Sequence, residues 1–199
     1  MSRSGLLTKE AISGASEDNL VAAARSGDVE AFGALFERHK NAVFSFVLRS
    51  VGRREDAEDI VAETFRKAWT AIARFKGQSS LLTWLCRIAA NLCIDYARRS
   101  KARVELATDM EMDADELRPW EAAGADVESE VINKWRIESA LAQLPMSHRV
   151  LVVLCDVQGL TCSEAAEVLG CSVMSVRTRL FRARRKLRAA LADVIEGVN

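Results

Sequence analysis

Seven basic side chains lie close together near the C-terminus of this 199-residue chain: Arg177, Arg179, Arg182, Arg184, Arg185, Lys186 and Arg188. Like charges at this density repel one another, and a bound polyanion relieves the repulsion. The chemistry that these residues suggest is therefore the binding of phosphate groups. A basic amphipathic helix can also lie on a membrane or bind a calmodulin-like protein. The secondary structure around these residues is needed to choose among the three partners.

Two helices joined by a three-residue turn are predicted to carry these arginines. Thr161 and Glu164 have the spacing of a capping box, Gly170 can end the first helix, and Ser172 can cap the second. The second helix has one apolar face, formed by Val173, Val176, Leu180, Ala183, Leu187 and Leu191. A membrane helix needs neither a capped helix before it nor a glycine turn, so the pattern favours a DNA-binding helix-turn-helix.

Charge is segregated along the chain although the 28 basic and 28 acidic residues cancel. Residues 79–103 contain five basic residues and one acid, whereas residues 105–130 contain ten acids and one arginine. The C-terminal helix is basic again. This order suggests two nucleic-acid surfaces separated by an acidic connector.

The composition predicts an all-α protein, because helix formers are plentiful and there are only two prolines. No apolar run is long enough to cross a bilayer and the N-terminus lacks a signal-peptide pattern, so we expect a cytoplasmic protein without membrane insertion. Five cysteines, an odd number without a CxxC pair, argue against disulfides and against a metal site. Neither histidine lies in a nucleophile motif, so we expect no catalytic residues, metal or cofactor.

Periodicity divides the chain into four parts. Residues 1–15 form a mobile leader, 16–103 a four-helix domain, 104–129 a flexible acidic linker and 130–199 a second helical domain with the helix-turn-helix. The predicted fold class is thus all-α, with two small helical domains joined by the linker.

Three segments together resemble one family. They are DAEDIVAETFRKAW, TWLCRIAANLCIDYARR and the stretch from LAQLPMSHRV to RARRKLR. In this order they are similar to extracytoplasmic-function (ECF) sigma factors of bacterial RNA polymerase. The resemblance implies a non-catalytic subunit that binds core enzyme, directs promoter-specific transcription initiation and is controlled by an anti-sigma factor.

The resemblance also implies where the chain contacts core polymerase. The helix DAEDIVAETFRKAW would dock on the β′ clamp helices, with Asp56, Asp59, Glu63 and Arg66 as polar contacts. Contacts with the β subunit are expected as well. The acidic linker would run toward the active-site cleft, where its charge could mimic nucleic acid, or it is simply a solvated tether.

By the same resemblance, the first domain opens the −10 element and captures a flipped base. The loop residues would be Phe75, Lys76, Gln78, Ser79 and Ser80, and the helix residues Asn91 and Asp95. Asn91 offers both a hydrogen-bond donor and an acceptor. Arg87, Arg98, Arg99 and Lys101 would hold phosphates of the displaced strand. Trp84 could stack on a base, but a place in the core is at least as consistent with its pattern.

The second domain would read the −35 element through Ser175, Arg177, Thr178, Phe181 and Arg182. Arginine can bind guanine with two hydrogen bonds, and Phe181 can contact a thymine methyl group. Arg184, Arg185 and Arg188 lie further along and fit phosphate contacts or solvent. Met174 stands where many family members have glycine, which leaves the −35 preference open.

Two other classes of protein compete with this interpretation. A free-standing helix-turn-helix regulator would carry a ligand pocket or a dimer interface in its first domain, whereas this chain has a charged docking helix and a basic helix there. A nuclease or small hydrolase would need a carboxylate or histidine cluster, which the sequence lacks.

Overall fold

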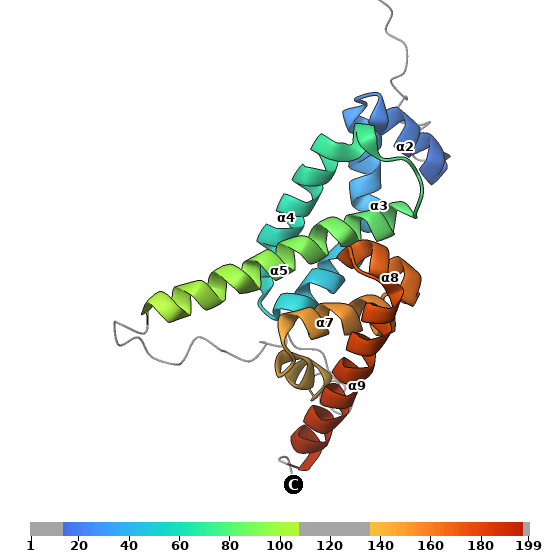
Figure 1. Cartoon of the computed structure of the whole chain (residues 1–199). Coiled ribbons are helices and arrows are strands. Elements are labelled where there is room, and N and C mark those ends of the chain that lie inside the picture. The colour runs from blue at the N-terminus through green and yellow to red at the C-terminus, as the bar shows by residue number, and fades with distance from the viewer. Residues whose placement is uncertain (1–13, 108–135, 197–199) are drawn as a thin grey trace, which may run out of the picture.

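The computed structural model describes residues 14–107 and 136–196. The first part contains α2 (Glu17–Arg25), α3 (Val29–Val51), α4 (Arg54–Ala71), the 3-10 helix η1 (Ile72–Arg74) and α5 (Leu81–Ala107). The second part contains a helical stretch at 136–142, then α7 (Met146–Val152), the π-helical turn η2 (Val153–Val157), α8 (Cys162–Leu169) and α9 (Val173–Glu196). No strand occurs in these two ranges, and the predicted all-helical fold with two domains is confirmed (Figure 1).

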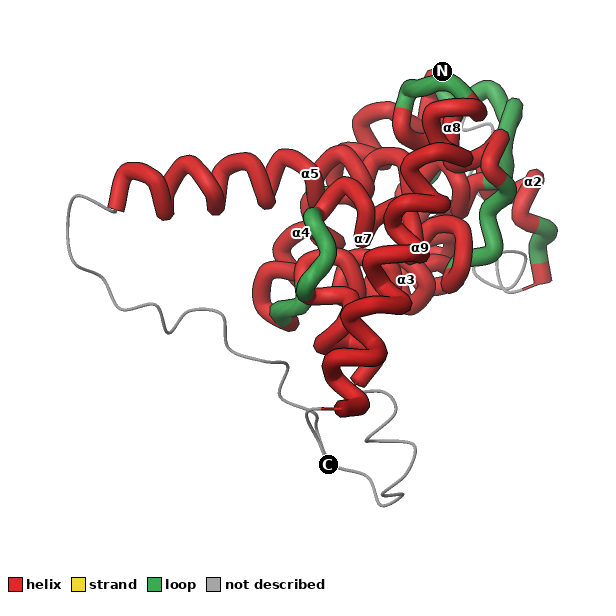
Figure 2. The backbone as a smooth tube through the Cα atoms, turned by 60° about the horizontal axis from the view of Figure 1, so that its bottom comes forward, coloured by secondary structure: helices red, strands yellow, loops and turns green. Residues whose placement is uncertain are grey.

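The predicted linker is only partly within the described residues. Helix α5 continues through Ala107, so it includes the first residues of the predicted linker, and its C-terminal end projects away from the other helices (Figures 1 and 2). Residues 108–129 of the linker and residues 1–13 of the predicted leader lie outside the described residues.

Local sequence signals set the ends of the helices in the first domain. Ser16 caps α2 by accepting a hydrogen bond from the Asn19 amide, and Asp28 caps α3 by accepting from two amides at 3.0 and 3.1 Å. Gly52 ends α3 in the left-handed conformation, with φ of 87°. A residue with a side chain adopts this conformation reluctantly, so glycine is the natural stop.

The core of the first domain joins α3, α4 and α5. The rings of Phe36 on α3 and Phe65 on α4 meet edge to face, 4.7 Å apart. On the other side of α4, the Tyr96 hydroxyl of α5 donates to the Asp56 carboxylate at 2.7 Å. One face of α4 is turned to the core, because Ala57, Ile60, Val61, Thr64, Phe65 and Ala68 are all buried.

The helix-turn-helix forms as predicted. Thr161 and Glu164 make the full capping box of α8, and Gly170 ends α8 with φ of 61°. The Ser172 hydroxyl then accepts from the Ser175 amide at 3.2 Å at the start of α9. Val176, Leu180 and Ala183 of α9 pack on buried residues of α7 and α8, which fixes the angle at which α9 leaves the domain.

Residues 153–157 depart from α-helical geometry. The apolar run that begins after Pro145 is α-helical only to Val152 and then widens into the π-helical turn η2. There the Gln158 amide bonds to the Val153 carbonyl at 2.9 Å, five residues back. Asp156 of this turn faces α9, where its carboxylate accepts from Arg184.

The two domains pack directly against each other, which the sequence analysis did not predict. One continuous buried cluster contains first-domain residues together with Val150, Val153, Leu154, Leu160 and Val168 of the second domain. Contacts run from α7 and η2 to α3, and from α7 and α8 to α5. Leu151 and Val152, which lie between Val150 and Val153 in the sequence, belong to the separate core of the second domain. The run from Val150 to Leu154 is apolar on all sides and must be buried on all sides, and the first domain covers one of these sides.

All five cysteines are free thiols in the structure. Cys86 and Cys93 are buried in α5, and burial raises the pKa of each thiol to about 12. No helix in the described part of the chain is both long and apolar enough to span a membrane. Within the same residues, no group of histidine, cysteine and acidic side chains could hold a metal ion.

Candidate nucleic-acid interface

One side of α9 is held in the core and the opposite side is open to solvent. The buried side is that of Val176, Leu180 and Ala183. The open side carries four of the five side chains predicted to read duplex DNA, and all four are exposed: Arg177, Thr178, Phe181 and Arg182. We call these four side chains the α9 reading face. It is positioned by the turn and the core beneath it, and nothing in the described residues covers it.

The reading face combines positive charge with apolar surface. Phe181 is 69 % exposed. Met174, seven residues or about two helical turns earlier and on the same side, is 67 % exposed. Ser175, the fifth predicted reader, is half-buried, and its amide is tied to Ser172. It therefore lies behind the other four, at the first turn of the helix.

Arg184 does not belong to the free basic surface. Its guanidinium binds both carboxylate oxygens of Asp156 on η2, with the Nε contact at 3.2 Å, and this pairing raises the arginine pKa. The pair ties α9 to η2 within the second domain. Arg184 was expected to meet phosphate or solvent, and no sequence signal pointed to its partner 28 residues away.

His148 of α7 lies close to the basic side of α9. Desolvation lowers the pKa of its imidazole, and the positive charges of Lys186, Arg179 and Arg182 lower it further. Its Nδ1 atom is buried without a hydrogen-bond partner among the described residues. The lowered pKa favours the neutral imidazole beside the basic side of α9.

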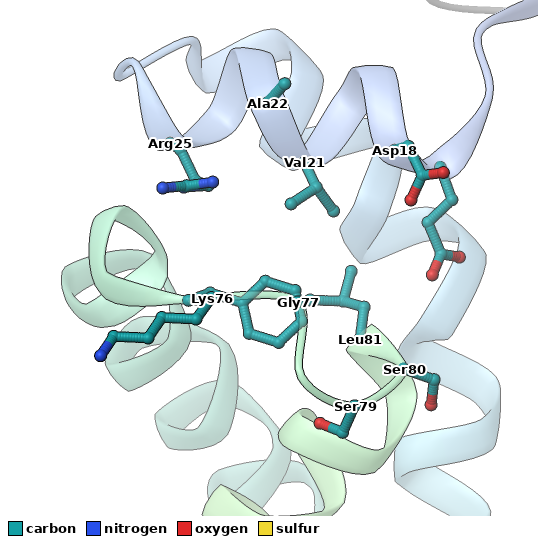
Figure 3. A pocket seen from close by; sticks show the side chains of 11 residues that line it. Asp18, Val21, Ala22, Arg25, Lys76, Gly77, Ser79, Ser80 and Leu81 are labelled. Carbon is teal, nitrogen blue, oxygen red and sulfur yellow. The ribbon is translucent and has the colours of Figure 1, made fainter.

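A hollow of about 250 Å³ lies between α2 and the loop that precedes α5. Figure 3 shows Arg25 and Lys76 at one end, and Asp18, Ser79 and Ser80 at the other. Four of the five predicted loop residues, Phe75, Lys76, Ser79 and Ser80, therefore line a pocket, whereas Gln78 does not. The contribution of α2 to its wall was not predicted.

The loop at this pocket is anchored at both ends. At the start, Phe75 is only 7 % exposed, and its ring packs on Trp84 of α5 with centroids 5.1 Å apart. At the end, the Ser80 hydroxyl accepts from the Thr83 amide at 3.1 Å and caps α5. Trp84 is half-buried against the core, which favours the packing role over the stacking role. Lys76 and Gln78 between the anchors are exposed.

A polar ribbon runs along the exposed side of α5 beyond the loop. Its members recur at helical spacing, with all but the half-buried Asp95 exposed: Arg87, Asn91, Asp95, Arg98 and Arg99. Asp95 pairs with Arg98 at 3.1 Å. Asn91 does not line the pocket, and at 1.5 Å per residue it lies about 15 Å along the helix from Leu81. The loop lines the pocket, whereas the ribbon begins about two helical turns further along α5. The side chain of Lys101 lies outside the described ones.

The predicted docking residues on α4 divide into two kinds. Glu63 and Arg66 pair on the surface through two hydrogen bonds of 2.6 Å, which lowers the pKa of the Glu63 carboxyl, and Asp59 is exposed nearby. Asp56, in contrast, accepts from Tyr96 and serves the contact between α4 and α5. In the view of Figure 1, α4 and α9 lie at opposite sides of the molecule.

Comparison with known proteins decides the family. A model of sigma-70 region 2 matches residues 35–103, and a model of sigma-70 region 4 matches residues 134–187. The chain belongs to the sigma-70 family. Region 2 therefore contains the loop, the α5 ribbon and α4, while region 4 contains the α9 reading face. A free-standing helix-turn-helix regulator does not account for region 2.

Named relatives place the chain among the ECF group of this family. The ECF RNA polymerase sigma factor BldN of Streptomyces coelicolor is 32 % identical over 175 residues, or 87 % of this chain, which spans 65 % of BldN. The ECF RNA polymerase sigma-E factor of Haemophilus influenzae is 33 % identical over 174 residues, covering 84 % of this chain and 91 % of that protein.

A solved structure shares the arrangement of helices. CnrH, in complex with the cytosolic domain of CnrY, matches with a TM-score of 0.61 at 35 % identity, covering 87 % of this chain and 96 % of CnrH. Helix α2 precedes the region 2 match, so the wall it adds to the pocket lies outside the family model.

Proposed function

We propose that this sigma factor binds core RNA polymerase and directs transcription from promoters that it recognises at two separate elements. One observation carries the proposal: a chain with two sigma-70 regions has two exposed polar surfaces of different chemistry, one in each region. The α9 reading face is basic and partly apolar, whereas the α5 ribbon mixes basic, acidic and amide groups.

The α9 reading face would enter the major groove of the −35 element. The N-terminal part of a recognition helix faces base edges, and Arg177, Thr178, Phe181 and Arg182 lie there. Arg177 and Arg182 can bind guanine, and Phe181 can cover a thymine methyl group. Arg185 and Arg188, exposed further along α9, would hold phosphates.

The loop and the α5 ribbon would hold the melted strand of the −10 element. Extruding a base costs a few kcal/mol, which stacking and hydrogen bonds at its edge must return. The pocket at Lys76, Ser79 and Ser80 has room for a base, and Asn91 can bind a second nucleotide further along the strand. Arg87, Arg98 and Arg99 would bind the phosphates between and beyond them.

The exposed charges of α4 would dock on the β′ clamp helices of core polymerase. Asp59, Glu63 and Arg66 are available for this contact, because they lie on the side of α4 that faces away from the core. Charges at the edge of an interface speed association and fix orientation more than they add affinity. Asp56 would act indirectly, by holding α4 against α5.

Phosphoryl transfer would remain in the polymerase, so we assign this chain no catalytic residue. Control by an anti-sigma factor is the regulation we propose, and the likeness to CnrH, which was solved together with the cytosolic domain of CnrY, supports a protein partner of this kind.

Run-off transcription with purified core polymerase tests the function. The chain is expected to co-elute with core enzyme and to produce defined start sites that core enzyme alone does not produce. Absence of co-elution, or start sites that are the same with and without the chain, would overturn the proposal. The variant Glu63→Arg places a second positive charge beside Arg66 and should slow association with core polymerase. Glu55→Arg makes the same charge change at the start of α4, away from the docking residues, and serves as the matched control.

A further inference from the structure

Arg149 joins the two domains through its guanidinium group. Its Nη1 atom donates to the Ser50 carbonyl of α3 in the first domain at 2.9 Å. Its Nη2 atom donates to the carbonyls of Ala142 and Leu144 in the second domain, at 2.6 and 3.1 Å. One side chain thus satisfies carbonyls at the C-terminal ends of two helices from two domains.

The surroundings of Arg149 explain why a charged group is stable there. The last carbonyls of a helix have no partner within it and carry partial negative charge, so a cation placed against them is favoured. Burial lowers the pKa of the guanidinium but leaves it charged. If the domains separated, the Ser50 carbonyl would lose the partner that the second domain provides.

A second polar contact and an apolar seam lie beside this group. The Gln158 side chain donates across the interface to the Ala42 carbonyl of α3 at 3.5 Å. Around both contacts the buried side chains of Val150, Val153 and Leu154 are continuous with the first-domain core. Separation of the domains would expose this apolar surface to water, which favours the closed arrangement.

This closed arrangement cannot serve both promoter elements together. Elements centred at −35 and −10 are 25 base pairs apart, or about 85 Å along the helix axis at about 3.4 Å per base pair. A compact chain of 199 residues has a radius of gyration of only about 16 Å. With α8 packed on α5, the α9 reading face and the α5 ribbon stay within one compact body.

We infer that Arg149 is an interdomain clasp that holds the free chain closed, and that the clasp must open before one promoter can be read at both elements. The second half of this inference rests on the proposed function, whereas the first half does not. Binding to core polymerase, which would hold the two regions apart, supplies the free energy of opening. The closed chain is then a resting state built into the fold.

Two buried thiols report on the clasp. Cys86 and Cys93 of α5 are fully buried, and the Cys93 thiol interacts with the side chain of Ser50, whose carbonyl accepts from Arg149. Both belong to the buried cluster that spans the two domains. Opening of the domains brings water to this side of α5, so the thiols should react faster with a maleimide.

The experiment compares the full-length wild type with Arg149→Leu and with the matched control Arg49→Leu. Arg49 also lies near the end of α3, but its side chain bonds to Ser45 of the same helix. We expect Arg149→Leu to increase the radius of gyration in solution X-ray scattering by several Å. Maleimide labelling of Cys86 and Cys93, followed by mass spectrometry, should accelerate about tenfold, with Arg49→Leu unchanged in both respects.

Far-ultraviolet circular dichroism and cooperative urea unfolding check that each variant is folded. If Arg149→Leu is folded but stays compact with slow labelling, the clasp is ruled out. If it does not fold, Gln158→Ala decides, because the Gln158 side chain also donates a hydrogen bond across the interface. That variant should accelerate labelling about twofold, and an unchanged rate would overturn the inference.

Transcription separates the clasp from the proposed function. An opened variant should reach half-maximal run-off transcription at a severalfold lower concentration than the wild type, because less free energy is lost in opening. If labelling accelerates but no variant, including the wild type, directs transcription, the clasp stands and the proposed function fails.

Discussion

The α9 reading face and the α5 ribbon, the two surfaces proposed to bind DNA, are built in different ways. The α9 reading face lies on a single rigid helix, whose other side is locked into the core by Val176 and Leu180. The loop and the α5 ribbon extend from an anchored loop along several turns of helix, and their polar groups have both signs of charge. A rigid basic face suits a duplex of fixed shape, whereas an extended mixed track suits a flexible single strand.

The same contrast appears in two phenylalanines. Phe75 at the loop is buried and supports the pocket from below, while Phe181 on α9 is open to solvent. The residue type alone therefore does not distinguish a side chain that is available to contact DNA from one that packs in the core. The following predictions use this difference, from the largest expected effect to the smallest.

Phe75→Ala is expected to destabilise the first domain by about 3–5 kcal/mol, because it removes a buried ring and leaves a cavity against Trp84. Phe181→Ala is the control and should change the free energy of unfolding by less than about 0.5 kcal/mol while weakening duplex binding. Urea unfolding of the full chain measures both. Equal losses of stability would show that the contrast between the two rings is false.

Arg182→Ala should weaken binding to the −35 duplex by about 1–3 kcal/mol and relax the preference at one base pair. Fluorescence anisotropy with a set of single-base variants of the duplex measures it. Arg98→Ala on the α5 ribbon is the control and should leave duplex binding unchanged. An unaltered preference at every position would remove Arg182 from the reading face.

Asn91→Ala should reduce the stability of the open complex by about 0.5–1.5 kcal/mol, the usual worth of a hydrogen bond to a base edge. Duplex binding at −35 should stay as in the wild type, since Asn91 lies in the other domain. Permanganate footprinting of the melted region reports the first quantity and anisotropy the second. A loss of both together would contradict the division of labour between the two surfaces.

The smallest expected effect is a pH dependence of stability caused by His148. Its pKa is lowered in the folded chain, so below an ordinary value near 6.5 the unfolded chain binds the proton more readily. Its unfavourable contribution is therefore absent above that pH and grows as the pH falls toward the folded pKa. His148→Gln should reduce the loss of unfolding free energy between pH 7.5 and about 5.5, and an unchanged pH profile would speak against this effect.

Local signals made much of the fold predictable from the sequence. The cap at Asp28, the stop at Gly52, the capping box at Thr161 and the turn at Gly170 each depend on a few neighbouring residues, and the structure has all of them. The exposed side of α9 followed from the spacing of its apolar residues. Such features need no knowledge of distant parts of the chain.

Features that depend on distant contacts were missed. The run from Val150 to Leu154 reads as an ordinary core helix, but its apolar surface on two sides indicates two buried faces, and the second is the first domain. Arg184 pairs with Asp156, which lies 28 residues earlier in the π-helical turn. No local sequence pattern predicted either the pair or the turn. Phe75 was placed among the strand-binding residues, because a loop between polar neighbours gives no sign of the Trp84 ring beneath it.

Selection of active promoters from a library of random sequences tests the central claim most directly. Core polymerase with this chain should transcribe templates that share two short conserved blocks at a fixed spacing. Arg182→Ala should reduce sequence conservation among the selected templates in the upstream block alone, and Asn91→Ala in the downstream block alone. A single block, reduced conservation in both blocks with either variant, or the same templates with core polymerase alone would contradict the account.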